Sequence, residues 1–514
     1  MPQLNNEEKI LLFVYSFYFL LSLYFALTSC LLPDEGTHLL LAIFYRDLFA
    51  HVIETGVSFD NAWNYGLEYL LHYPKLQIAY PPVYHFLLAF LFIFFQSELV
   101  GRFISTVLYI LSASLVFKIT RKISSPKAAL ISSTAFLSYL YVFRFSFLAQ
   151  QDMCVYFFTL LSLYFFLEMG KNSTPRNIFL LGVLCSLAAL SKQMGGVTAF
   201  IYALIFLTEK AQLKERAKNI SLLLLGFSVL VLPYAVLLSK IGGMEINMFQ
   251  GFYYAFSQGE PTSYLNPMLW LWYIVKTFLE YPPVIVLFAA LAIYVRERKT
   301  YWKEFFVFSL LFYLTLSVIL NKELRFSTFF LIPAFISLGA LTERKSIFAL
   351  SAILLLFLPS LALTFSSSFS FPVSEVIELF TEKGNVAYFG ESGKNMPFSS
   401  VIMWMSRKAE GNKALEEQRH HFRGCNFVNL TDEESVFAAL KKKGVRYLIV
   451  YPNSPVNVSL LGKVKVLKKF ETKDGNLEVY EFLDYEESAE FCNRICLTGW
   501  KLCRENGNVK LIKS

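Results

Sequence analysis

Two adjacent carboxylates, Asp34 and Glu35, stand where the first apolar run of the sequence ends, in the segment LLPDEGTHLL. A carboxylate that lies within hydrogen-bond reach of a hydroxyl can act as its general base. If the turn after Pro33 is helical, His38 shares a helix face with Asp34, one turn further on. The same residues also suit an ordinary helix start with an acidic cap, and this alternative stays open. The segment therefore predicts Asp34 as a catalytic base, Glu35 as a catalytic residue beside it, and His38 as a neighbour in the substrate cleft.

A further acid, Asp152, follows the segment FRFSFLAQQ, and Gln151 precedes it directly. Two carboxylates that face one cleft could have different roles, one as the general base and the other as a ligand of the acceptor or of a divalent cation. A cation is the weaker interpretation, because two acids and His38 make a thin ligand set. We predict Asp152 as a catalytic acid and Gln151 as a residue of the substrate cleft, with no definite metal site or other cofactor.

Positive charge that suits a phosphate comes from the segment NKELRF (321–326). Lys322 and Arg325 can hold a phosphate, and Glu323 can orient either side chain. Lys192, in the segment SKQMGG (191–196), adds a further donor or, alternatively, extends towards the membrane interface. A phosphate carried on a lipid would sit at this depth. The three cations are therefore predicted ligands of a donor phosphate.

The composition indicates that these residues belong to a membrane protein. Of the 514 residues, 55% are hydrophobic and only 17% are charged, and the mean hydropathy is +0.48. Apolar runs such as 10–32 and 221–238 reach the roughly 18 residues that make a spanning helix. The net charge of +8 is concentrated in short loops, at 118–127, 210–218, 296–303 and 344–345. Such loops mark the cytoplasmic side of a membrane, and this distribution leaves no basic face for nucleic acid.

Threading the chain through these loops predicts a mainly α fold, a polytopic transmembrane helix bundle of about 11 spans. The predicted spans are 10–32, 101–117, 128–145, 153–169, two within 178–207, 221–239, 283–295, 305–320, 327–341 and 347–365. The N-terminus is then cytoplasmic, and all the acids and cations named above lie on the outer side. Ionisable residues at membrane depth are usually functional. The transmembrane domain is predicted to cover residues 1–365, with a large first outer loop at 33–100.

Residues 366–514 have the composition of a soluble domain, which is predicted to be an extracytoplasmic α/β domain. Its expected strands are 385–390, 444–451, 463–470 and 477–483, and its expected helix is 431–444. The segment GESGK (390–394) lacks the spacing of a phosphate-binding loop. Four cysteines lie in this domain, at positions 425, 492, 496 and 503. Their spacing favours disulfides over zinc, and the pairing stays open.

Taken in order, these short motifs resemble the GT-C glycosyltransferases, polytopic enzymes that take a sugar from a polyprenyl-phosphate donor. The motifs are PDE after the first span, AYPPVYHFLLAF (79–90), Arg102 and Ser105 opening the second span, Asp152 at the start of the fourth, and KELRF (322–326). The first half is similar to the protein-mannosyltransferase and aminoarabinose-transferase branch. That resemblance implies that Asp34 is the catalytic base and Asp152 the second acid. Tyr80 and His85 are expected to line the cleft beneath the first outer loop.

The late motif is also similar to that of the mannosyltransferases that use dolichyl-phosphate-mannose, with Asn321 in place of their histidine. The resemblance implies a multi-pass glycosyltransferase, for hexosyl or pentosyl groups, of a cell membrane or an ER-type membrane. It would move a sugar from a polyprenyl (dolichyl)-phosphate to a glycan, lipid-linked or protein acceptor, with inversion. A transporter or lipid flippase is the alternative, and a membrane-anchored binding scaffold is a third interpretation. The sequence leaves the sugar and the acceptor open.

Overall fold

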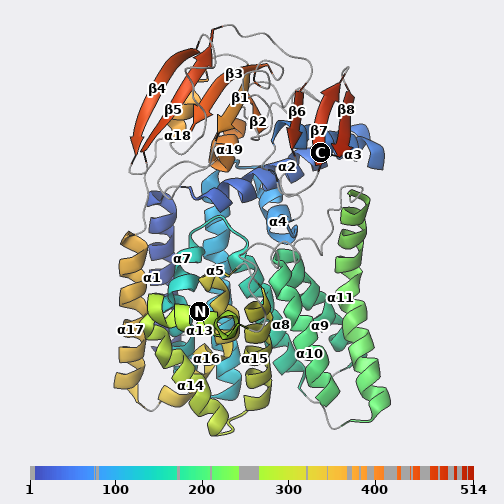
Figure 1. Ribbon diagram of the computed structural model, residues 1–514. Coiled ribbons are helices and arrows are strands. Elements are labelled where there is room, and N and C mark those ends of the chain that lie inside the picture. The colour runs from blue at the N-terminus through green and yellow to red at the C-terminus, as the bar shows by residue number, and fades with distance from the viewer. Residues whose placement is uncertain are drawn as a thin grey trace. The chain divides into compact units, whose positions relative to one another are not determined.

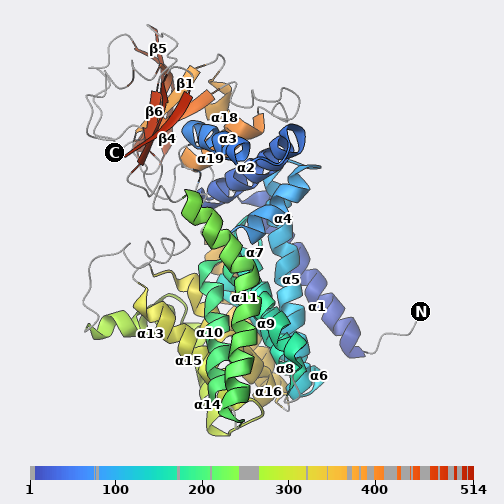
Figure 2. The same ribbon diagram turned by 90° about the vertical axis from the view of Figure 1, so that its right-hand side faces the viewer.

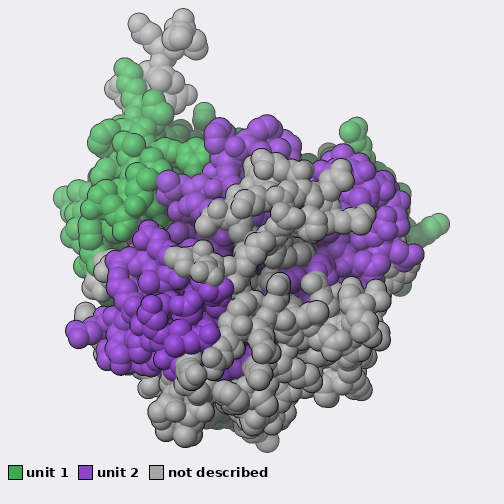
Figure 3. Space-filling model, turned by 90° about the horizontal axis from the view of Figure 1, so that it is seen from above, with its two compact units in different colours: residues 1–28, 79–84, 101–368 green, residues 29–78, 85–100, 369–514 purple. Residues whose placement is uncertain are grey.

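The computed structural model describes residues 6–514 except 30, 74–75, 77–79, 171–173, 209–210, 242–265, 320–321, 344, 367–372, 381–383, 390–398, 410–424, 430–439, 441–443, 452–463, 473–474, 484–490, 495–499, 506–507 and 514. The chain forms two compact units, coloured separately in Figure 3. Unit 1 contains residues 1–28, 79–84 and 101–368, and unit 2 contains residues 29–78, 85–100 and 369–514.

Unit 1 is a bundle of apolar helices (Figure 1). Its elements are α1 (Asn6–Thr28), α5 (Glu98–Ile123, whose first residues belong to unit 2), α6 (Pro126–Ser138), α7 (Leu140–Ser146), α8 (Asp152–Met169), α9 (Pro175–Ser191), η1 (Gln193–Gly196), α10 (Val197–Thr208), α11 (Leu213–Ile241), α13 (Pro267–Glu280), η3 (Pro282–Val284), α14 (Ile285–Arg296), α15 (Trp302–Val318), η4 (Leu324–Phe326), α16 (Ser327–Thr342) and α17 (Ser346–Ser366). Six described helices are long and apolar enough to cross a membrane, or up to eight if each of two bent pairs counts as one span. The predicted class, a multi-pass helical membrane protein, is confirmed, while the number of 11 spans stays a prediction.

Breaks interrupt several of the apolar helices and expose polar backbone groups between them. The segment predicted to be broken at 191–196 is divided into α9, η1 and α10, with Lys192 in an extended conformation between α9 and η1. The helices α6 and α7 are bent by 68° at a break, and α13 and the following helix by 117°. Ionisable side chains at such breaks can reach polar surroundings while the flanking helices stay in the apolar layer.

Two glycines allow α9 and α11 to approach closely, as Figure 2 shows for α9, α10 and α11 side by side. A Cβ added at Gly182 would lie 2.1 Å from the carbonyl oxygen of Leu223, and one at Gly226 would lie 2.1 Å from that of Phe179. Membrane helices associate through such small residues, because lipid supplies no hydrophobic driving force between them.

We expect Gly182→Ala to lower the midpoint temperature of unfolding in detergent, because the added methyl group forces α9 away from α11. Overpacking of this kind costs about 1–3 kcal/mol. Gly196→Ala is the matched control, since a Cβ there meets only Ala189 Cβ at 3.5 Å and Phe227 Cζ at 3.9 Å. Equal midpoints for the two variants would contradict the close contact.

Unit 2 contains the helices of residues 33–100, the predicted first outer loop, together with the C-terminal strands. Its elements are α2 (Pro33–Thr55), α3 (Phe59–His72), α4 (Val83–Phe92, which begins in unit 1), α18 (Val373–Glu378), α19 (Ser399–Ala409), β1 (Gly384–Phe389), β2 (Cys425–Asn429), β3 (Val445–Val450), β4 (Val464–Thr472), β5 (Gly475–Phe482), β6 (Phe491–Arg494), β7 (Trp500–Glu505) and β8 (Asn508–Lys513). The first sheet has the order β2-β1-β3-β5-β4, and the second has the order β6-β7-β8.

The larger sheet is mixed. Strand β1 runs parallel to β2 and β3, while β5 is antiparallel to β3 and β4. Its core is a cluster of apolar residues, namely Ala387, Phe389, Leu440, Val445, Leu448, Val450 and Tyr480. The four predicted strands correspond to β1, β3, β4 and β5, so the predicted α/β class is confirmed. The predicted helix 431–444 and the segment 390–394 lie largely outside the described residues.

Candidate active site

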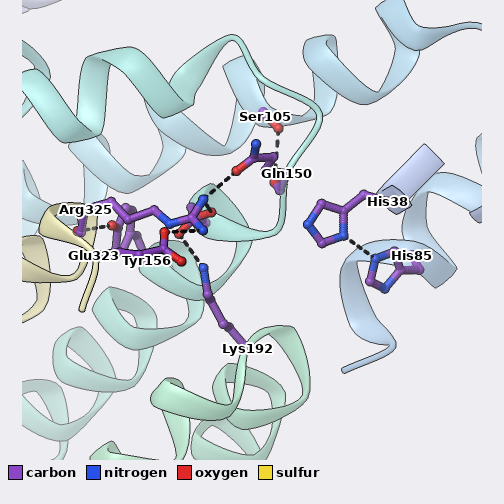
Figure 4. A network of polar contacts seen from close by, with 9 residues as sticks. His38, His85, Ser105, Gln150, Tyr156, Lys192, Glu323 and Arg325 are labelled. Atoms are coloured by element: carbon purple, nitrogen blue, oxygen red, sulfur yellow. Dashed lines mark hydrogen bonds and ion pairs between the residues drawn. The ribbon is translucent and has the colours of Figure 1, made fainter. Parts of the chain in front are cut away.

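A buried acid, Asp152, lies between two cations in unit 1. Figure 4 labels the cations, Lys192 and Arg325. Asp152 is the first residue of α8, and its side chain is only 1% exposed. Lys192 Nζ lies 2.8 Å from Asp152 Oδ1, and Arg325 Nη1 lies 3.4 Å from Asp152 Oδ2. The three residues come from helix ends far apart in sequence, so the helix breaks bring them together. Because a buried charge needs a partner, Asp152 holds both cations in place.

Arg325 has further partners that fix its guanidinium. Its Nη1 donates to Gln150 Oε1 at 2.7 Å, and Glu323 forms an ion pair with its Nη2. The Tyr156 hydroxyl donates to the Arg325 carbonyl oxygen at 2.7 Å, which holds the backbone of η4. The guanidinium lies 4.9 Å from the centre of the Phe145 ring. Cation–π contact and charged hydrogen bonds together hold the side chain in one orientation.

Lys322 has a different environment from the other two cations. Its Nζ donates to the carbonyl oxygens of Leu316, Ser317 and Ile319, at 3.2, 2.7 and 2.9 Å, at the C-terminal end of α15. A helix leaves such carbonyls without partners within the helix and carries partial negative charge there, so the ammonium caps α15. Burial lowers the pKa of Lys322 to about 8. Its predicted role as a phosphate ligand stays a prediction.

Two other predicted cleft residues lie in unit 1. Gln151, next to Asp152, is buried, and its side-chain oxygen has no hydrogen-bond partner among the residues that the structure describes. A buried acceptor of this kind suits a ligand hydroxyl or amide. Tyr80 is partly buried, and its carbonyl oxygen accepts a hydrogen bond from the Tyr234 hydroxyl at 2.9 Å.

The paired acids Asp34 and Glu35 lie on the first turn of α2, in unit 2, and their environments differ. Asp34 is exposed, whereas Glu35 is fully buried. Glu35 Oε2 accepts a hydrogen bond from the Leu32 amide at 2.9 Å, so this carboxylate closes the start of the helix. The environment of Asp34 therefore suits contact with a substrate better than that of Glu35, whose predicted catalytic role stays a prediction.

His38 and His85 form a buried pair within unit 2. His38 Nδ1 lies 2.9 Å from His85 Nε2, and the ring centres are 5.1 Å apart (Figure 4). One of the two facing nitrogens must donate and the other accept, so a single proton lies between them. Within the described part of the chain, no group of three or more His, Cys, Asp or Glu side chains could hold a metal ion.

The predicted residues thus fall into two sets. Asp152, Lys192, Glu323 and Arg325 meet in unit 1, and Asp34, Glu35, His38 and His85 belong to unit 2. Gln150, which completes the first set, was not predicted as a site residue. Its position beside Gln151 and Asp152, in an otherwise apolar stretch, is the signal that could have identified it.

Comparison with known proteins bears on what these sets can do. The model of the dolichyl-phosphate-mannose-protein mannosyltransferase family matches residues 79–236. None of the curated proteins matches the sequence. Among solved structures, ArnT from Cupriavidus metallidurans in the apo state superposes with a TM-score of 0.62 at 12% identity, over 91% of this chain and 97% of that chain. The chain has the GT-C fold.

Two further GT-C structures resemble the chain. ArnT from Cupriavidus metallidurans bound to undecaprenyl phosphate gives a TM-score of 0.62 at 12% identity, over 92% of this chain and 98% of that chain. The archaeal oligosaccharyltransferase AglB from Archaeoglobus fulgidus, in complex with an inhibitory peptide and a dolichol-phosphate, gives a TM-score of 0.51 at 12% identity. The superposition covers 86% of this chain and 69% of that chain. The resemblance to the GT-C fold, first indicated by short motifs, is therefore confirmed.

Proposed function

We propose that the chain is a membrane glycosyltransferase that moves a sugar from a polyprenyl-phosphate donor to an acceptor hydroxyl on the outer face of the membrane. The observation that carries this proposal is the buried trio of Asp152, Lys192 and Arg325 at the ends of apolar helices. Two cations share one buried carboxylate there, and the second acid of the set, Glu323, is 36% exposed. The buried part of the set therefore carries a net positive charge that suits a lipid phosphate. The GT-C fold favours a transferase over the alternative of a transporter or flippase.

In the proposed reaction, the Asp34 carboxylate removes the proton of the acceptor hydroxyl as its oxygen attacks the anomeric carbon. The bond between the sugar and the phosphate oxygen breaks, and its electron pair leaves with the lipid phosphate. Lys192 and Arg325 stabilise the negative charge that develops on that phosphate. Direct displacement of this kind inverts the anomeric centre. Asp152 keeps the two cations in position, and the buried Gln151 oxygen accepts a hydrogen bond from the donor.

Orientation follows from the basic loops. With the loops at 118–127 and 210–218 on the cytoplasmic side, the N-terminus is cytoplasmic and the C-terminal strands are extracytoplasmic. The acceptor, whether a glycan, a lipid-linked glycan or a protein, then approaches from outside. A reporter that becomes active only outside the cytosol should be active when fused at the C-terminus. A reporter that is active only in the cytosol should be inactive there, and activity of that reporter would reverse this orientation.

The direct test of the proposed function is an assay of sugar transfer in proteoliposomes that contain the purified chain. With labelled polyprenyl-phosphate sugars and an extract of outer-surface glycans and proteins as the acceptor source, we expect labelled product and free polyprenyl phosphate in equal amounts. Transport without bond cleavage would give labelled donor inside the vesicles and no free lipid phosphate. That result would replace the transferase by the transporter.

The charge of Lys322 predicts a pH dependence. With a pKa near 8, the ammonium is mostly charged at pH 7 and mostly neutral at pH 9. If its charge attracts the donor phosphate, the KM for the donor should rise roughly twofold to fivefold between these pH values. Lys322→Arg keeps the charge at both pH values and should remove the rise. An equal rise in this variant would assign the pH dependence to another group.

A further inference from the structure

Helix α19, from the C-terminal part of the chain, packs along α2, the helix that begins beside Asp34; both belong to unit 2 (Figure 1). The first contact is at Gly36, two residues after Asp34. A Cβ added at Gly36 would lie 2.7 Å from both the carbonyl carbon of Ser400 and the amide nitrogen of Val401. These are backbone atoms of the first turn of α19, which cannot rotate away. A glycine is therefore needed for α19 to approach α2 this closely.

The second contact is an ion pair buried between the same two helices. Arg407 Nη2, on α19, donates to Asp47 Oδ2, on α2, at 2.8 Å, and both side chains are fully buried. Arg46 Nε donates to Asp47 Oδ1 at 2.9 Å, and the Tyr69 hydroxyl, on α3, donates to Asp47 Oδ2 at 3.1 Å. Burial and the charge of Asp47 raise the pKa of Tyr69, so it remains a hydroxyl donor.

The spacing of these contacts determines what they can fix. Gly36 and Asp47 are three helical turns apart on α2, about 16 Å at 1.5 Å per residue. One contact would leave α2 able to pivot, whereas two contacts at this separation restrain both its tilt and its rotation. The rotation of α2 sets where the exposed Asp34 carboxylate lies, because Asp34 is on its first turn.

Helix α19 is itself held by the other elements of the first outer segment. The Trp404 ring stacks on Phe92, at the end of α4, with ring centres 5.5 Å apart and an interplanar angle of 22°. Lys408 Nζ lies 2.6 Å from Glu98 Oε2, at the start of α5. The C-terminal helix thus contacts α2, α3, α4 and the start of α5, and it acts as a common support for them.

We infer that α19 is a clamp that positions the Asp34 carboxylate, with Gly36 and Arg407 as positioning residues. This inference rests on the proposed function, in which Asp34 is the base. It gives the C-terminal part of the chain a role in the chemical step, separate from any contact with the acceptor.

Gly36→Ala tests the clamp with the smallest possible change. The methyl group must push α19 away from α2, and we expect kcat for sugar transfer to fall about 10–100-fold, the loss that follows a displacement near 1 Å. The KM for the polyprenyl-phosphate donor should stay within about twofold, because the donor phosphate ligands are unchanged. Gly66→Ala, on α3, is the matched control, since a Cβ there meets only Phe44 Cζ at 3.8 Å. It should behave as wild type.

Arg407 supplies an independent variant in the full-length chain. Arg407→Lys keeps the charge and should retain more kcat than Arg407→Gln, which leaves Asp47 with one cation fewer. All rates are measured per mole of monodisperse protein, so that a smaller amount of folded protein is not mistaken for a lower kcat. Wild-type kcat in Gly36→Ala, or an equal loss of kcat and donor affinity, would overturn the clamp. If Asp34→Asn also keeps full transfer, the role of Asp34 as the base fails, and the absence of any sugar transfer by the wild type would overturn the proposed function. If Asp34→Asn is inactive while Gly36→Ala is fully active, only the clamp fails.

Discussion

Asp34→Asn is expected to reduce sugar transfer by about 10²–10⁴-fold while leaving the amount of folded protein in the membrane unchanged. Removing a general base has an effect of this size, because the acceptor hydroxyl then reacts without proton transfer in the transition state. The side chain is exposed at the start of α2, so its replacement by an isosteric amide creates no cavity. The rate is measured in membranes supplied with labelled polyprenyl-phosphate sugars.

Asp60→Asn is the matched control for this variant. Asp60 is also an exposed acid on the first turn of a helix, α3, and no part of the proposed site includes it. It should transfer sugar at the wild-type rate. A fall of less than tenfold in Asp34→Asn, or an equal fall in both variants, would remove Asp34 as the base.

Asp152→Asn should have the second large effect, on both stability and transfer. The carboxylate separates two buried cations, Lys192 and Arg325, and its loss leaves them facing each other. Breaking a buried ion pair costs about 3–5 kcal/mol, which should lower the midpoint temperature of unfolding in detergent by many degrees. Combining Asp152→Asn with Lys192→Met should recover much of that stability and none of the transfer, because the second change removes the repulsion and also a phosphate ligand.

Glu168→Gln provides the comparison on the same helix, α8. Glu168 forms an ion pair with Lys122 at 3.0 Å, and the two side chains are 46% and 30% exposed. An exposed pair contributes at most about 1 kcal/mol, so this variant should unfold near the wild-type temperature. If Asp152→Asn unfolds at the same temperature as Glu168→Gln, or if the double variant transfers sugar, the account of the trio is wrong.

Sequence patterns predicted the features of this fold that local chemistry determines. Apolar runs predicted the membrane helices, and the SKQMGG segment predicted the helix break at which Lys192 lies. Alternating β-branched and aromatic residues predicted strands β1, β3, β4 and β5. Strands β2 and β6 were not predicted because they have only five and four residues, and β7 and β8 were not predicted because they carry several charged residues.

Contacts between distant segments were beyond what those patterns contain. Arg407 and Asp47 are separated by most of the chain, and neither lies in a motif, so their buried ion pair has no local signature. Gly36 belongs to no sequence pattern that requires a glycine, although the backbone of α19 requires one there. The type and position of Lys322 predicted a phosphate ligand. In the structure its ammonium donates to the backbone carbonyl oxygens at the end of α15, the helix that precedes it.

Lipid binding by the purified chain tests the central claim most directly, because it needs no knowledge of the sugar or the acceptor. The midpoint temperature of unfolding is measured with undecaprenyl phosphate and with undecaprenol, the same lipid without its phosphate. We predict that the phosphate lipid raises the midpoint by several degrees at saturation, that the alcohol does not, and that Arg325→Gln loses the difference. Equal shifts with both lipids, or an undiminished phosphate effect in Arg325→Gln, would contradict a donor-phosphate site formed by Lys192 and Arg325.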